Sequence, residues 1–92
     1  DTLVFKVMGK MFALVGLKKW EEGDHSVNLK CDPEKALKLR EKYPDEIYGG
    51  YHMSKKHWNT VVVNGPHLTP RHLQEFINHS YDLVTSKLSA SA

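Results

Sequence analysis

Two hydrophobic runs open the chain, LVFKVM at residues 3–8 and MFALVGL at residues 11–17. Both are rich in the β-branched, aromatic and aliphatic residues typical of strands, and Leu3, Phe5 and Val7 alternate onto one face. Gly9-Lys10 separates the runs and suits a two-residue turn of type II′. The pattern therefore predicts a β-hairpin, followed by a polar loop at residues 18–24.

The next segment predicts a strand and then a helix. In HSVNLK, residues 25–30, Val27 and Leu29 alternate with polar residues, as in a strand with one buried face. DPE at residues 32–34 is a helix start, because Asp caps free N–H groups, Pro fits the first helical position and Glu favours the positive end of the helix dipole. The helix should end near Tyr43, since a proline follows. Its predicted buried side comprises Ala36, Leu39 or Arg40, and Tyr43.

The second half predicts one further strand and one long helix. Residues 45–50 read as a loop, residues 51–53 can add a short strand, and a turn at residues 54–57 leads into a strand at 58–63. A helix begins at Thr69-Pro70. Apolar residues then recur at helical spacing, which is typical of an amphipathic helix on a sheet: Leu73, Phe76, Ile77, Tyr81, Val84 and Leu88.

The element order β-β-β-α-β-α predicts an α+β fold, a mainly antiparallel sheet with helices packed on one face. The 92 residues suffice for one domain, which we expect at residues 1–88 with a flexible tail at 89–92. A single cysteine excludes an intrachain disulfide framework and favours a reducing cytoplasm. No apolar run is long enough to span a bilayer. We expect a cytoplasmic monomer.

The distribution of charge is more informative than the net charge of +2. The segments 2–19 and 47–72 contain no acidic residue, and they carry lysines, Arg71 and several histidines. If the two segments share a surface, that surface is basic and attracts phosphates.

The stretch GGYHMSKKHWNT, residues 49–60, mixes planar rings with cations and suits phosphate contacts plus stacking. Each residue also has a structural interpretation: the lysines can be solvated, the histidine can bond a backbone carbonyl, Trp can belong to the core and Asn can bond the local backbone. The candidate binding residues, including two in the first hairpin, are Lys55, Lys56, His57, Trp58, Asn59, Lys6 and Lys10.

The sequence offers little support for catalysis, a metal or a cofactor. The pairs His52/His57 and His67/His72 lack the i, i+4 spacing of a helical zinc pair, and no second Cys is available. The acidic run at residues 21–24 reads as a solvated loop. We therefore expect a binding protein that is not an enzyme and carries no cofactor.

Several segments together resemble the MmcQ/YjbR family of small bacterial proteins. They are LVFKVMGKMFAL, NLKCDPEKALKLREKYPD, GYHMSKKHWNTV and INHSYDLVTSKL, which cover residues 3–88 in family order. The resemblance implies a "double wing" α/β fold and DNA binding, and it implies no catalytic residues. Family members also begin with a helical segment that this sequence lacks, so the resemblance implies a truncated N-terminus.

Two functions remain open at this point. The first is a DNA-binding protein whose basic hairpin and turn contact phosphates of double-stranded DNA. The second is a protein- or small-ligand-binding module that uses Tyr51, Trp58 and the adjacent glycine-flanked loop.

Overall fold

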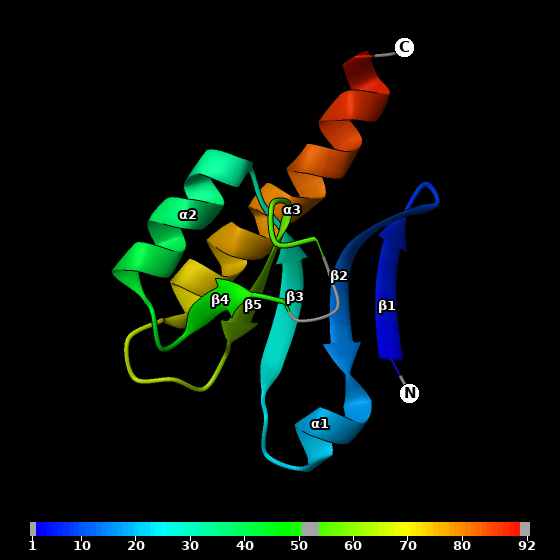
Figure 1. Ribbon diagram of the computed structural model, residues 1–92. Coiled ribbons are helices and arrows are strands. Elements are labelled where there is room, and N and C mark those ends of the chain that lie inside the picture. Colours follow the sequence, from blue (N-terminus) through cyan, green and yellow to red (C-terminus); the bar gives the residue numbers. More distant parts are fainter. Residues whose placement is uncertain (1, 51–53, 91–92) are drawn as a thin grey trace.

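The computed structural model describes residues 2–50 and 54–90, with side chains up to Thr85. A five-stranded antiparallel sheet has the strand order β1-β2-β3-β5-β4, and the two longer helices cover one of its faces (Figure 1). This confirms the predicted α+β class. The elements are β1 (Thr2–Val7), β2 (Lys10–Gly16), α1 (Leu17–Glu21), β3 (Ser26–Lys30), α2 (Pro33–Lys42), β4 (Ile47–Gly49), β5 (Trp58–Val62) and α3 (Pro70–Ala90).

The predicted hairpin is confirmed, but its turn lies one residue earlier than expected. Val7 pairs with Lys10, so the loop is Met8-Gly9, and both residues have positive φ, 50° and 79°. Positive φ at both central residues defines a type I′ turn, whose twist matches that of the flanking strands. The predicted type II′ turn at Gly9-Lys10 is therefore wrong. Phe12 is the extra residue of a bulge in β2.

Two segments expected to be loops contain regular structure. α1 begins at Leu17, which was predicted as the last residue of the second strand, and continues into the predicted loop 18–24. Its Trp20 ring packs against His25 with ring centres 4.6 Å apart. β4 forms within the predicted loop 45–50, where Ile47 is buried and pairs with Val61 of β5. Elements of five and three residues are too short to show a hydrophobic period. The strand suggested at residues 51–53 lies outside the described residues.

Helix α2 follows its sequence signals closely. The Asp32 carboxylate accepts a hydrogen bond from the Lys35 amide at 3.2 Å, and Pro33 occupies the first turn. The helix ends at Lys42, and the Tyr43 amide caps it by bonding the Leu39 carbonyl. Ala36 is almost completely buried, as the predicted stripe requires.

Helix α3 packs on β2 and β3 through a narrower stripe than predicted. Phe76, Ser80 and Val84 are buried, whereas Ile77 and Tyr81 are 41% and 42% exposed. The buried Ser80 hydroxyl donates to the Phe12 carbonyl and accepts from the Lys30 amide at 2.9 Å. A polar residue thus lies at the centre of the buried stripe. The apolar periodicity of the sequence predicted a wider buried face than α3 has. The helix continues to Ala90, into the predicted tail.

Glu46 is a buried carboxylate that connects β4 to the segment before α3. It accepts hydrogen bonds from the His67 and Leu68 amides at 3.0 and 3.2 Å and from the His67 ring Nδ1 at 2.7 Å. Burial alone raises the pKa of Glu46, but these three hydrogen bonds outweigh it and hold the pKa below its usual value. Gly65 lies so close that a Cβ there would collide with the carboxylate.

In the described parts of the chain, no helix is both long and apolar enough to cross a membrane.

Because the folded-state pKa of Glu46 lies below the ordinary value of 4.5, the ionised carboxylate stabilises the fold at higher pH. This contribution should be fully present above about pH 4.5 and should be lost as the pH falls through the folded-state pKa. Urea unfolding of the parent chain and Glu46→Gln between neutral pH and about pH 3 measures it. The stability difference between the two should shrink on acidification. Glu75→Gln, at an exposed position of α3, serves as the control, and a pH-independent difference for Glu46→Gln would contradict the assignment.

Candidate nucleic-acid interface

The topology brings basic residues from three separate segments to one end of the sheet. The β1–β2 turn, the end of β3 and the start of β5 lie together at this end, at the top of the view in Figure 1, because each strand is antiparallel to its neighbours. Lys6 and Lys10 flank the first turn and are exposed. We define the basic end by its five lysines and one histidine, namely Lys6, Lys10, Lys30, Lys55, Lys56 and His57.

The turn that carries Lys55 and Lys56 is fixed by its backbone. The Ser54 carbonyl accepts from the His57 and Trp58 amides at 3.2 and 2.9 Å. The Cys31 amide bonds the His57 carbonyl at 2.8 Å, which attaches the turn to the end of β3. The side chains of residues 54–57 are exposed, so the two lysines and His57 project from an anchored loop.

Arg40 of α2 hydrogen-bonds to this turn and to the start of β5. Its Nε donates to the Asn59 side-chain oxygen at 2.7 Å, and a terminal nitrogen donates to the carbonyls of Lys55 and Trp58, the latter at 3.1 Å. A guanidinium suits this role because its donors lie in a fixed fork. The stem of Lys55 also lies on Gly49, where a Cβ would be 3.0 Å from the Lys55 Cγ. These contacts fix the Lys55 backbone and stem, and the amino group of Lys55 extends beyond them.

Trp58 and Asn59 do not belong to this surface, which corrects their place among the candidate residues. Their exposed fractions are 7% and 2%, because they begin β5, which lies between β3 and β4. The Lys30 amino group lies 5.9 Å from the centre of the Trp58 ring. Trp58 is therefore a buried residue that contacts Lys30 of the basic end. Asn59 is a buried hydrogen-bond acceptor for Arg40.

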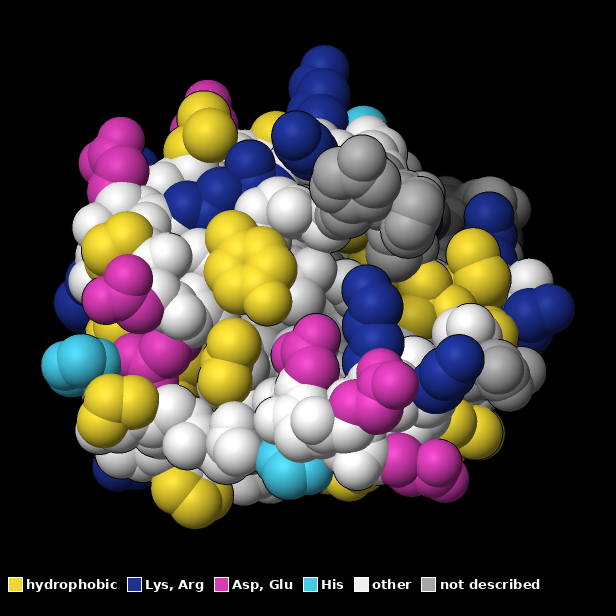
Figure 2. All heavy atoms as spheres, turned by 60° about the horizontal axis from the view of Figure 1, so that its bottom comes forward, with side chains coloured by type: hydrophobic (Ala, Val, Ile, Leu, Met, Phe, Trp, Pro, Cys, Tyr) yellow, Lys and Arg dark blue, Asp and Glu magenta, His cyan; other side chains and the backbone are white. Residues whose placement is uncertain are grey.

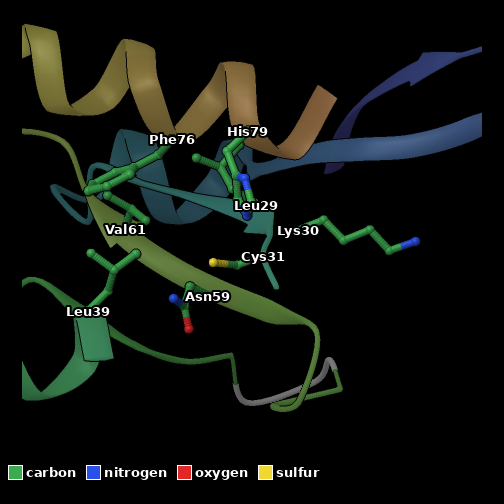
Figure 3. Close-up of a pocket in the computed structure, with 8 residues that line it drawn as sticks. All are labelled: Leu29, Lys30, Cys31, Leu39, Asn59, Val61, Phe76 and His79. Atoms are coloured by element: carbon green, nitrogen blue, oxygen red, sulfur yellow. The ribbon is translucent and has the colours of Figure 1, made fainter. Parts of the chain in front are cut away.

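A small cavity of about 10 Å³ lies under the basic end, between the sheet and the helices (Figure 3). Cys31, Asn59 and His79 line it together with apolar side chains. The Asn59 amide nitrogen is buried and has no hydrogen-bond partner among the described residues. Burial raises the pKa of the Cys31 thiol, which favours its protonated form.

His79 has a structural role beside this cavity. Its Nε2 accepts a hydrogen bond from the Asp32 amide at 3.2 Å, at the start of α2. Burial lowers the pKa of His79, which favours the neutral ring that this acceptor role requires.

The opposite, helix-free face of the sheet contains a hollow of about 480 Å³. On the sheet floor, Asn28 and Thr60 are joined by a 2.6 Å hydrogen bond, and Leu14 and Tyr48 flank them. Burial, followed by the charge of Asp24, raises the pKa of Tyr48. Figure 2 shows that the face brought forward there mixes hydrophobic, basic and acidic side chains, so it presents no field of a single sign. Sequence reasoning missed this hollow because α1 and β4, which supply Lys19 and Tyr48, were read as loops.

Among the described residues, no group of three or more His, Cys, Asp or Glu side chains is arranged to hold a metal ion. Three of the described histidines have hydrogen-bond partners of other kinds. His67 bonds Glu46, His72 bonds Thr69 at the start of α3, and His25 contacts the Asn64 amide.

The fold and its elements place this molecule among small α+β domains built on an antiparallel sheet. The YjbR family model matches residues 1–83, and the chain belongs to the YjbR family, as its sequence motifs indicated. The Escherichia coli O157:H7 protein YbdF is 41% identical over 86 residues, which are 94% of this chain and 66% of that protein. YjbR of E. coli K12 is 32% identical over 90% of this chain and 66% of its own length. Both carry the name "uncharacterized protein".

Solved structures show the same fold. The crystal structure of Deinococcus radiodurans protein DR2400, a DUF419 domain, superposes with a TM-score of 0.80 at 41% identity, over 94% of this chain and 62% of that one. A crystal structure from Pseudomonas syringae gives 0.69 at 33% identity, over 90% and 76%. The chain thus spans slightly less than two thirds of the E. coli relatives and of the D. radiodurans protein.

We predict that Arg40→Met destabilises the domain by about 2–3 kcal/mol, because charge-assisted hydrogen bonds are lost and buried acceptors are left unpaired. Hydrogen exchange should rise at residues 55–58 more than in β1 and β2. Lys38→Met, at an exposed position of the same helix, is the matched control. Unchanged exchange in the turn of Arg40→Met would show that Arg40 does not hold it.

Proposed function

We propose that the chain is a non-catalytic DNA-binding domain that contacts the phosphates of a duplex through its basic end. The observation that carries this proposal is the meeting of the two acid-free segments at one end of the sheet. Lys6 and Lys10 come from the first segment, and Lys55, Lys56 and His57 come from the second. Lys30 lies between them at the end of β3.

The geometry supports backbone contact and not the reading of bases. Phosphate contacts require cations at an accessible edge, and the exposed lysines meet that requirement. The residues with the best chemistry for stacking or for bonding a base edge, Trp58 and Asn59, are buried. The proposal therefore predicts binding that depends weakly on DNA sequence and steeply on salt.

If all five lysines contact phosphates, the logarithm of affinity should fall with the logarithm of salt concentration with a slope of roughly −4 to −5. Lys55→Ala/Lys56→Ala should reduce the magnitude of that slope by about 2 and weaken binding to every duplex alike. Fluorescence anisotropy with a labelled duplex at about 50 and 200 mM salt measures both effects.

The matched control is Lys18→Ala/Lys19→Ala. These lysines are exposed on α1, at the bottom of the view in Figure 1, and their removal changes the net charge equally. If both double variants lost the same DNA affinity, the loss would come from the lower net charge alone. The basic end would then have no specific part in binding. No binding by the correctly folded parent chain at either salt concentration would refute DNA binding by this domain.

A second candidate function, small-ligand binding, is favoured by the hollow on the helix-free face. Its volume of about 480 Å³ falls in the range of ligand sites, and Asn28, Thr60 and Tyr48 supply polar atoms beside Leu14. This site replaces the one expected around Trp58, which is buried. A ligand here should shift the amide resonances of Asn28 and Thr60 in a fragment screen by NMR. Its affinity should persist in high salt and in the Lys55/Lys56 double variant, and hits that shift only the basic end would exclude the hollow.

A further inference from the structure

The side-chain amide of Asn59 has a fixed orientation. Its oxygen accepts a hydrogen bond from the Arg40 Nε at 2.7 Å, and because a guanidinium can only donate, the amide oxygen and nitrogen cannot exchange places. The nitrogen must therefore lie on the side of the amide away from Arg40. Figure 3 shows it between Leu39 and Cys31, with the oxygen pointing away from Cys31. Arg40 thus directs the Asn59 nitrogen towards the cavity under the basic end.

The Asn59 nitrogen needs an acceptor in that cavity. It is buried and has no hydrogen-bond partner among the described residues. Asn59 as a whole is 2% exposed, because it lies in the interior strand β5. Leaving a buried amide donor unpaired costs more free energy than ordering one water molecule beside it, which is why buried polar groups are nearly always paired.

The cavity has the size that one water molecule requires. Its volume of about 10 Å³ is close to the smallest space that holds a water, and it excludes a larger ligand. A cavity lined only by apolar side chains stays dry. Here the apolar side chains of Leu39 and Phe76 share the lining with the polar groups of Cys31, Asn59 and His79, so the lining favours a water.

The polar groups around the cavity complement a water molecule. The Asn59 nitrogen donates, and the Cys31 thiol both donates and accepts weakly. The Cys31 sulfur points into the same space as the Asn59 nitrogen (Figure 3). The His79 Nε2 accepts from the Asp32 amide, so in the neutral ring Nδ1 carries the proton and is a further donor. Buried waters typically make about three hydrogen bonds, which matches these three groups.

We propose that this cavity is a binding site for one ordered water molecule, which accepts a hydrogen bond from the Asn59 nitrogen and contacts the Cys31 sulfur. The water extends the polar network of Arg40 from the carbonyls of Lys55 and Trp58, through Asn59, to Cys31 beyond the end of β3. The Asn59 amide is then held on both sides. The site lies between the sheet and the helices, and the proposal does not depend on DNA binding.

Water–protein cross-relaxation measured by NMR tests the site in the folded parent chain. The side-chain amide protons of Asn59 should give a signal to water with the sign of a long-lived contact, which separates it from proton exchange. The side-chain amide of Asn78, exposed on α3, is the internal control, because surface waters leave too quickly to give this signal. A crystal structure should show the water oxygen about 2.7–3.2 Å from the Asn59 Nδ2.

Two substitutions of Cys31 test the second contact. Cys31→Val fills the cavity with a larger apolar side chain and should abolish the water signal at Asn59. The matched control, Cys31→Ser, offers a hydroxyl that bonds water more strongly than a thiol and should retain it. Circular dichroism should show that both variants fold, and the parent measurement is decisive by itself if Cys31→Val does not. A parent chain without a long-lived water at Asn59, a signal that survives in folded Cys31→Val, or a signal lost from Cys31→Ser would each overturn the proposal.

Discussion

The guanidinium of Arg40 joins three parts of the molecule that are distant in sequence: helix α2, the start of β5 and the turn that carries Lys55 and Lys56. It bonds one side-chain oxygen and two backbone carbonyls, and in the described structure it forms no ion pair with an acid. Its charge is therefore dispersed over neutral dipoles and is not cancelled. These bonds hold the turn so that Lys55 and Lys56 project into solvent. Arg40 itself adds a third positive charge near the two lysines, and a carboxylate partner would have neutralised that charge.

The same principle recurs at the other contacts between layers. Ser80 ties α3 to both β2 and β3 through two backbone groups, and Glu46 ties β4 to the segment that leads into α3. Each polar group is buried and bonded, so displacing it would leave unpaired donors and acceptors in the interior. Apolar contacts do not depend on direction, whereas each of these hydrogen bonds requires a particular distance and angle between donor and acceptor. They fix the positions of the helices, and the apolar residues supply most of the driving force.

The elements that sequence predicted best were those with a complete local signal. The Asp32 cap, the proline after it and the proline after Tyr43 delimit α2 without help from the rest of the chain. β4 could not be found in this way, because Ile47 is a strand residue only through its pairing with Val61. Trp58 illustrates the same limit for the site. Its neighbours in sequence are cations, and only the sheet order reveals that it begins an interior strand. By contrast, the exposure of Lys55 and Lys56 was predictable, since a turn of charged residues has no apolar face to bury.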